Sequence, residues 1–369
     1  MNKKKSTVAV LTDDLKGHGG EETVLRLFSD YLSNSYKLEM IFPMFEGNVN
    51  WFDLFQDNQN GVHYNTKQTK LNKYVFVTRM LMKAKVDVLI CMTPQLTYFA
   101  SIIRRIFHKQ YKIVSWQHFS IFRPTDKSSF LDKKKWYNSA DYCFAISSGI
   151  KRELISLRIN PDRIFTIFNP IIPVDKPINK KKSSGATHFL CIARIQFKQQ
   201  KNLQDLFDAC QKLKGNWILD IYGNDDSEGN IEITKCKNYV KGLGIEKKVI
   251  WHGWVEDIWS EDIHPNCLVL TSNFEGFPMS LCEAASHGIP LIAADCPTGP
   301  EDIVNVQNGY LYQMHHIEKL TNLMQKFIDG NVNFDIKLVK ESVSKFYVDN
   351  YIKKVKNSIE KIIEENNEK

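Results

Sequence analysis

The chain has 369 residues, of which 43% are hydrophobic and 25% are charged. This length and composition are typical of a globular protein with two domains of ordinary size, and they exclude a largely disordered chain. The formal net charge of +7 is moderate. Because the sequence has no nucleic-acid recognition motif and no interleaving of aromatic and basic residues, we do not expect nucleic acid as a partner.

The beginning of the chain has no pattern of an export signal. The apolar run Val8–Leu11 is too short for a signal peptide, and the acids Asp13 and Asp14 follow where a cleavage site would lie. No stretch approaches the roughly 18–20 apolar residues that span a bilayer. We therefore expect a cytoplasmic protein.

The eight cysteines form no close pair of the kind that binds zinc or performs redox chemistry. Several stand in apolar runs, which is typical of small buried side chains in a reducing compartment. The histidines show no H-x-x-x-H pattern, so we expect no metal site.

Lysines are clustered at Lys133–Lys135 and again at Lys180–Lys182. Each cluster alone is typical of a solvated surface. Together with Arg104 and Arg105 they also suit anionic lipid head groups or a phosphorylated acceptor. Peripheral binding to the inner face of the cytoplasmic membrane is therefore one interpretation.

Short apolar runs alternate with longer amphipathic segments along the first half of the chain, which predicts a parallel sheet wrapped by helices. One predicted helix is Glu22–Leu32, and another begins after the pair Ser147 and Ser148, a residue type that favours a helix N-cap. The expected strands are Val8–Leu11, Leu38–Phe42, Val86–Cys91, Ile113–Trp116, Tyr142–Ile146 and Ile164–Phe168.

A segment rich in proline and lysine interrupts this alternation and reads as a linker. The alternation then resumes, and a lysine- and glutamate-rich amphipathic helix ends the chain. The second set of expected strands is Phe189–Ala193, Ile218–Tyr222, Val249–Trp251, Leu268–Leu270, Leu291–Ala294 and Tyr310–Tyr312. We therefore predict an α/β protein with two Rossmann-like, doubly wound domains that face each other across a cleft. The predicted boundaries are 1–170, a linker at 171–186, 187–345, and a final helix at 346–369 that packs back toward the first domain.

The most informative stretch runs from Thr271 to Glu283, directly after an expected strand. Pro278 fits the first position of a helix and Gly288 fits the end of it. The backbone N–H groups of the first helical turn would form an anion site suited to a diphosphate, and Gly276 would let the backbone approach a ligand closely. We therefore predict ligand contacts from Gly276, Phe277, Pro278 and Met279.

Two glutamates flank this turn. Glu275 lies in the turn itself and could accept hydrogen bonds from sugar hydroxyls, while Glu283 lies on the helix and could accept them from a ribose. Taken singly, each is better explained as a turn residue or a solvated helix residue, and it is their combination with Gly276, Pro278 and the helix start that favours function. A pair of carboxylates also suits a glycoside hydrolase, but a turn built to receive phosphate favours transfer over hydrolysis.

Three further groups follow strands and point to the same ligand. Arg194 and Lys201 could neutralise the charge that grows on a departing diphosphate. Gly19 and Gly20 form a glycine turn at the start of the first helix, although the pattern is not the dinucleotide fingerprint. His118 follows a strand of the first domain and could hold a sugar hydroxyl, or could be a structural histidine bonded to backbone.

The stretch from Glu275 to Glu283 resembles the signature of the retaining GT-B glycosyltransferases of family 4, and the resemblance extends over nearly the whole chain. Residues 116–120, 145–151, 168–170, 214–217, 294–296 and 308–312 are similar, within that family, to the enzymes that add galactose to bacterial lipopolysaccharide in α-1,6 linkage. There are departures. Ala193 replaces a usual glycine, Gly223–Asp225 replaces the usual Gly-Asp/Glu-Gly turn, and the segment 255–266 is short.

The resemblance implies roles for the candidate residues. It matches Arg194 and Lys201 to the pair that binds the diphosphate, and Glu275 and Glu283 to the contacts with the donor sugar and the ribose. His118 matches a histidine near the transferred sugar. Trp254 lies where the base is recognised. Gly19 and Gly20, with Glu22, match the first glycine loop.

The implied activity is a retaining, UDP-sugar-dependent hexosyl transfer that needs no metal or cofactor. Galactose is the expected sugar and the lipopolysaccharide core the expected acceptor. UDP-glucose or a UDP-N-acetylhexosamine, with a lipid-linked or capsular acceptor, stays open. Two other classes also stay open: a catalytically silent nucleotide-binding partner of another transferase, and a sugar-nucleotide epimerase, for which no acid/base pair is found.

Overall fold

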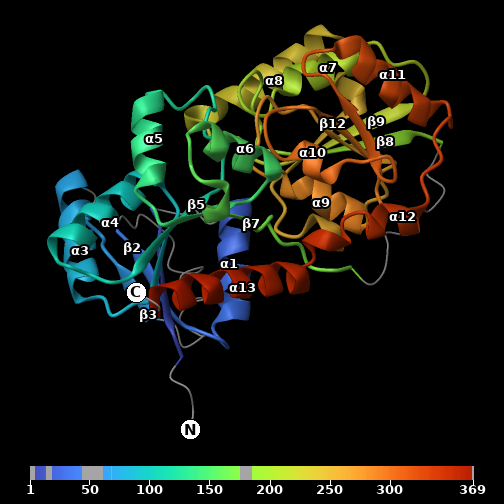
Figure 1. Cartoon of the computed structure of the whole chain (residues 1–369). Coiled ribbons are helices and arrows are strands. Elements are labelled where there is room, and N and C mark those ends of the chain that lie inside the picture. Colours follow the sequence, from blue (N-terminus) through green and yellow to red (C-terminus); the bar gives the residue numbers. More distant parts are fainter. Residues whose placement is uncertain (1–4, 14–18, 44–60, 68, 175–184, 368–369) are drawn as a thin grey trace. The chain divides into compact units, whose positions relative to one another are not determined.

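The structure is a computed structural model that describes residues 5–13, 19–43, 61–67, 69–174 and 185–367. The chain forms two compact units (Figure 1). The first consists of Met1–Pro170 together with Val348–Lys369, and the second is Ile171–Tyr347. Each is an α/β unit built on one parallel sheet.

The first unit has a seven-stranded sheet with the strand order β3-β2-β1-β4-β5-β6-β7. Its strands are β1 (Thr7–Leu11), β2 (Lys37–Phe42), β3 (Gly61–Tyr64), β4 (Val88–Cys91), β5 (Lys112–Gln117), β6 (Tyr142–Ala145) and β7 (Ile164–Thr166). Its helices are α1 (Gly20–Leu32), α3 (Lys70–Lys83), α4 (Pro94–Ile106), α5 (Phe130–Asn138), α6 (Ser148–Ser156), the short η1 (Pro161–Arg163) and α13 (Val348–Asn367).

The local sequence accounts for these elements. Strands β4 and β6 are buried along their whole length, as expected for a parallel sheet covered on both faces. Helix α6 begins at Ser148, one residue before the predicted start, because Ser147 is the N-cap and its hydroxyl accepts a hydrogen bond from the N–H of Ile150. Helix α13 contacts α1, β4 and β5, so the last helix of the chain completes the first unit.

The second unit has a six-stranded sheet with the order β10-β9-β8-β11-β12-β13. Its strands are β8 (Thr187–Ile192), β9 (Trp217–Tyr222), β10 (Val249–Gly253), β11 (Cys267–Leu270), β12 (Leu291–Ala294) and β13 (Gly309–Tyr312). Its helices are α7 (Leu203–Gln211), α8 (Ile231–Gly242), α9 (Met279–Ser286), α10 (Pro300–Ile303), α11 (Ile317–Ile328) and α12 (Ile336–Glu341), with short turns η2 (Glu228–Asn230), η3 (Glu246–Lys248), η4 (Ile258–Ser260) and η5 (Ser344–Phe346).

Both sheets have the strand order of the Rossmann fold, and in each the order reverses between the first and the fourth strand of the unit. In the second unit this point lies between β8 and β11, whose Leu190 and Leu268 are paired. Ligands of such sheets bind outside the carboxyl ends of the strands at that point. The predicted fold class is therefore confirmed, and the topology predicts a ligand site between the carboxyl ends of β8 and β11.

All twelve strands predicted from the sequence exist, with ends that shift by a few residues. Strand β3 was not predicted. It lies at the edge of its sheet, and its pattern is half-buried with no continuous apolar run, so Val62 alone carries little signal. Within the described residues, no helix combines the length and apolar character that crossing a membrane requires.

Candidate functional site

Two loops leave the carboxyl ends of the neighbouring strands β8 and β11 and form one structure. The side-chain hydroxyl of Thr271 donates to the carbonyl oxygens of Lys201 and Asn202, each at 3.1 Å. The backbone N–H of Asn273 donates to the carbonyl oxygen of Gln200 at 2.7 Å. These bonds fix the loop that carries Arg194 and Lys201 against the turn that carries Glu275.

Lys201 and Glu275 form an ion pair in which Nζ lies 2.7 Å from Oε1. Their side chains are only 16% and 7% exposed, so the pair is largely removed from water. A lysine ammonium has three N–H donors. It can therefore hold the glutamate and still reach a second anion such as a phosphate oxygen.

Arg194 lies at the same strand end. Its Nη2 donates to the side-chain oxygen of Gln200 at 2.8 Å, and its Nη1 lies 4.0 Å from a carboxylate oxygen of Asp226. The Arg194 side chain is 48% exposed, so the guanidinium is open to solvent and to a ligand. Because the guanidinium stays charged at any physiological pH, it suits a diphosphate.

The turn before α9 is tightly packed. The hydroxyl of Thr298 donates to the carbonyl oxygen of Glu275, and the N–H of Glu275 donates to the carbonyl oxygen of Pro297 at 3.2 Å. Gly299 has a φ of +100°, and a Cβ there would lie 2.6 Å from Cδ of Pro278 and 3.0 Å from the carbonyl oxygen of Gly276. Only glycine fits that position without displacing the turn.

Helix α9 begins one residue later than the sequence predicts, at Met279 and not at Pro278. Pro278 is the N-cap residue of α9 rather than its first helical residue, with φ −73° and ψ 94°. Its carbonyl oxygen accepts from the N–H of Leu281, which is the part an N-cap carbonyl plays. A proline has no side-chain acceptor, so this cap leaves the first N–H groups of α9 for another partner. Gly288, with φ +78°, ends the helix as predicted.

Glu283 is the fifth residue of α9 and is half-buried. Burial raises the pKa of its carboxyl, a hydrogen bond with the Trp259 side chain lowers it, and the charge of Asp257 raises it. The Trp259 ring also stacks on His287 with ring centroids 4.2 Å apart. The predicted base contact Trp254 is 45% exposed. Trp259, which sequence reasoning missed, thus contacts Glu283.

In the first unit, His118 follows β5 and is 6% exposed. Neither ring nitrogen has a hydrogen-bond partner among the described residues. The ring lies 4.6 Å from that of Trp116. Burial lowers the pKa of His118 to about 3, so the imidazole is neutral at physiological pH. A buried imidazole without a protein partner is costly, which favours a ligand contact over a structural bond to backbone.

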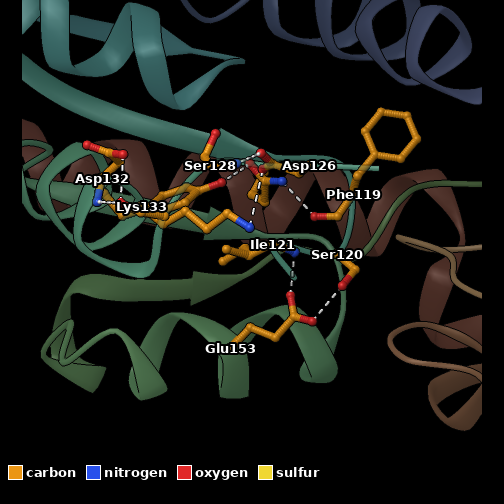
Figure 2. Close-up of polar contacts among 11 residues, drawn as sticks. Phe119, Ser120, Ile121, Asp126, Ser128, Asp132, Lys133 and Glu153 are labelled. Atoms are coloured by element: carbon orange, nitrogen blue, oxygen red, sulfur yellow. Dashed lines mark hydrogen bonds and ion pairs between the residues drawn. The ribbon is translucent and has the colours of Figure 1, made fainter. Parts of the chain in front are cut away.

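The segment after His118 is held from two sides. The side-chain amide of Gln117 donates to the carbonyl oxygen of Phe119 at 2.6 Å, and Tyr137 donates to Gln117 at 2.6 Å. Figure 2 shows Glu153 beneath the segment, where its two oxygens accept from the Ser120 hydroxyl and the Ile121 N–H, both at 2.6 Å.

The same loop is closed at its far end by a second group of polar contacts. The backbone N–H of Ser128 donates to Asp126 at 2.9 Å, and the buried ammonium of Lys133 lies 3.5 Å from the same carboxylate (Figure 2). Lys133, the first residue of the basic cluster, is therefore an internal ion-pair partner and no part of the charged surface.

The first glycine loop is described only in part, since residues 14–18 lie outside the described residues. Gly19 is the N-cap of α1 and Gly20 its first residue, and both are exposed. The first turn contains Glu21 and Glu22. Burial, together with the charges of Glu22 and Asp13, raises the pKa of Glu21 to about 7 against the opposing charge of Arg123.

The structure thus gathers most of the predicted donor residues in the second unit: Arg194, Lys201, Glu275, Gly276, Phe277, Pro278 and Met279 lie at the switch point, with Glu283 on the helix that follows. His118, Gly19 and Gly20 belong to the first unit, and their contact with the same ligand stays a prediction. Among the described residues, no three His, Cys, Asp or Glu side chains gather as a metal site would require.

Known protein families and individual proteins are similar to this chain in sequence. The pattern of the family described as Glycosyltransferase Family 4 matches residues 18–173, and that of Glycosyl transferases group 1 matches residues 175–342. The chain is 31% identical to the lipopolysaccharide 1,6-galactosyltransferase of Escherichia coli (strain K12), over 93% of this chain and 95% of that protein. It is 31% identical to the Salmonella typhimurium protein of the same name, over 95% of this chain and 98% of that protein.

Solved structures of other proteins have the same fold as this chain. The apo lipopolysaccharide outer core galactosyltransferase WaaB superposes with a TM-score of 0.82 at 28% identity, over 96% of this chain and 99% of that one. Anabaena HepE in complex with UDP, at 17% identity and a TM-score of 0.77 over 96% of this chain and all of that one, shares the fold. The two Rossmann-like units and these matches define a GT-B glycosyltransferase. The chain belongs to glycosyltransferase family 4.

Proposed function

We propose that this enzyme transfers galactose from UDP-galactose to a lipopolysaccharide acceptor, with retention of the anomeric configuration. The donor and the acceptor are inferred from the two 1,6-galactosyltransferases that match this chain over most of its length. The observation that carries the proposal is the grouping of Arg194, Lys201 and the start of α9 at the switch point of one Rossmann-like sheet. Two cations and a helix N-terminus at one place suit a diphosphate.

In this proposal the diphosphate is the leaving group. As the bond between the sugar C1 and the phosphate oxygen breaks, negative charge grows on that oxygen, and Arg194, Lys201 and the N–H groups at the start of α9 stabilise it. Because this charge is larger in the transition state than in the bound donor, the stabilisation raises the rate. No metal ion is required for it.

The acceptor hydroxyl forms its bond to C1 on the face from which the diphosphate departs, and its proton passes to a departing phosphate oxygen. Glu275, held by Lys201, orients the sugar hydroxyls. Glu283 accepts from the ribose hydroxyls, and His118 contacts the transferred sugar as a neutral imidazole.

A donor screen with the purified enzyme tests this proposal. UDP-galactose should give the fastest release of UDP with a lipopolysaccharide-core acceptor, EDTA should not reduce the rate, and the product should carry an α-anomeric proton by NMR. Faster turnover of UDP-glucose or a UDP-N-acetylhexosamine would reassign the donor. Tight UDP binding without turnover on any acceptor would favour the catalytically silent partner.

We also propose that an anionic membrane surface receives the first unit, since the proposed acceptor is a glycolipid. The segment 122–135, which includes α5, carries the exposed apolar side chains of Phe122, Phe130 and Leu131 and the exposed Lys127 and Lys135. Phe122 and Phe130 stack with parallel rings whose centroids are 6.3 Å apart. Exposed apolar residues beside lysines favour the boundary of an anionic bilayer.

Flotation with vesicles separates this surface from the active site. The enzyme should float with vesicles of phosphatidylglycerol and not with phosphatidylcholine alone. Changing Phe130 and Leu131 to serine should abolish flotation and leave the release of UDP in detergent solution unchanged. Flotation of that double variant at the wild-type level would remove the surface from the proposal.

A further inference from the structure

Gln200 lies in the loop after β8, between Arg194 and Lys201 in the chain. It is 7% exposed, while its neighbour Gln199 is exposed. A buried glutamine side chain needs partners for both ends of its amide, because an unpaired polar group in the interior is costly.

Both ends of this amide have partners. Its oxygen accepts from Nη2 of Arg194 at 2.8 Å, and its nitrogen donates to the carbonyl oxygen of Phe274 at 3.1 Å. An arginine can only donate and a carbonyl can only accept, so the amide has one orientation that satisfies both. Gln200 therefore joins the guanidinium directly to the residue that precedes Glu275.

This link matters because the ion pair that Arg194 forms among the described residues is weak. The carboxylate of Asp226 lies 4.0 Å from the guanidinium and is 66% exposed, so that ion pair is weak. A free arginine side chain loses about 2 kcal/mol of rotamer entropy when it becomes ordered. A residue that holds the guanidinium in place before the ligand arrives removes part of that cost from binding.

We propose that Gln200 is a positioning residue that presents Arg194 to the diphosphate of the donor and keeps it in register with the Glu275 turn. The inference rests on the proposed function, since it assumes a diphosphate at this site. It predicts that Gln200 acts on the donor through Arg194 and touches neither the sugar nor the acceptor.

Calorimetry with UDP tests the proposal, with Gln199 as a matched control. Q200M keeps the side-chain volume and removes both hydrogen bonds, and it should weaken UDP binding about tenfold, the effect of losing one hydrogen bond to a charged group. Q199M, one residue away on the exposed side of the loop, should bind UDP as the wild type does. Equal affinity of Q200M and the wild type would overturn the proposal.

A double-mutant cycle excludes a merely structural effect. If Gln200 acts through Arg194, Q200M should add little to the loss already caused by R194A. A tenfold loss in both backgrounds would show that Gln200 supports the fold of the loop and not the arginine, and would overturn the inference with the proposed function intact. Failure of the wild-type enzyme to bind UDP would instead remove the proposed function.

Discussion

The ammonium of Lys201 lies 2.7 Å from the carboxylate of Glu275, and both side chains are largely buried between the loops that follow β8 and β11. A buried pair of this kind is costly to break on one side only, because the remaining charge has no partner and little water. The pair therefore has a structural role before any ligand binds. Truncation of one partner changes the stability of the fold as well as any contact with a ligand, so a second variant that removes both charges is needed for comparison.

K201A should lower the free energy of unfolding by about 3 kcal/mol, since it leaves the Glu275 carboxylate buried and unpaired. The double variant K201M/E275Q removes both charges and should be distinctly more stable than K201A. Urea unfolding of the two proteins measures the difference. If K201A is as stable as the double variant, the buried charge is not the cause of the loss.

E275Q should reduce the rate of galactosyl transfer at least about a hundredfold, because an amide cannot replace a carboxylate that accepts hydrogen bonds from the sugar. UDP affinity should change much less, since Lys201 keeps its charge and Arg194 is held by Gln200 and not by this carboxylate. A transfer rate within threefold of the wild type would contradict the role proposed for Glu275.

Gly299 should tolerate no side chain. In G299A a residue is forced into positive φ, and its Cβ displaces Pro278 and Gly276, so both stability and UDP affinity should fall. Gly244 offers a matched control, because its φ is +71° and a Cβ there would meet nothing within 4 Å. G244A should cost about 1 kcal/mol of stability and leave UDP affinity unchanged. Equal effects of the two substitutions on UDP binding would show that the Pro278 turn is not strained by the added atom.

The sequence was sufficient to predict the two sheets and the residues at their strand ends. Arg194, Lys201 and Glu275 each follow an apolar run, and the carboxyl ends of parallel strands meet at one edge of a sheet, so their convergence in one unit could be predicted. The relation of these residues to His118 could not be obtained in the same way, because it depends on how two domains sit together.

Other residues carry no pattern at all. Gln200, Trp259 and Glu153 are single polar or aromatic residues, and what each does depends on a partner between 24 and 74 positions away. The periodicity of hydrophobic residues predicts burial and secondary structure, but it does not predict which distant group a side chain contacts. These contacts become visible only in three dimensions.

His118 should give the stability of the enzyme a characteristic pH dependence. Its pKa of about 3 in the folded state lies below the ordinary value of 6.5, so the unfolded chain binds a proton between these values and the folded chain does not. Stability should therefore fall as the pH drops below about 6.5 and stay level above it, with a loss of about 1 kcal/mol at pH 5.5.

The variant H118Q isolates this contribution. The raised pKa of Glu21 acts in the opposite direction over much of the same range, so the wild type alone does not report on the histidine. The difference in unfolding free energy between wild type and H118Q, measured by urea at pH 7.5 and at pH 5.5, should shrink or reverse at the lower pH. The same difference at both values would show that His118 is not buried in its neutral form.

Glu153 should control the segment that follows His118. Its oxygens accept from the Ser120 hydroxyl and the Ile121 N–H, and burial raises the pKa of its carboxyl (Figure 2). In E153Q the amide oxygen still accepts from the Ile121 N–H and the NH₂ group donates to the Ser120 hydroxyl, so two hydrogen bonds to a charged carboxylate become neutral ones and about 1–2 kcal/mol of stability is lost.

The effect of E153Q on activity should exceed that of S120A, which removes one donor and leaves the Ile121 bond in place. I155Q, on the exposed side of the same helix, should match the wild type in both stability and turnover. Because the proposed contact of His118 is with the sugar and not with UDP, E153Q should lower kcat for UDP-galactose while leaving the affinity for UDP alone unchanged. A loss of UDP affinity equal to the loss of kcat would mean that Glu153 supports the fold in general, and its role in placing His118 would have to be abandoned.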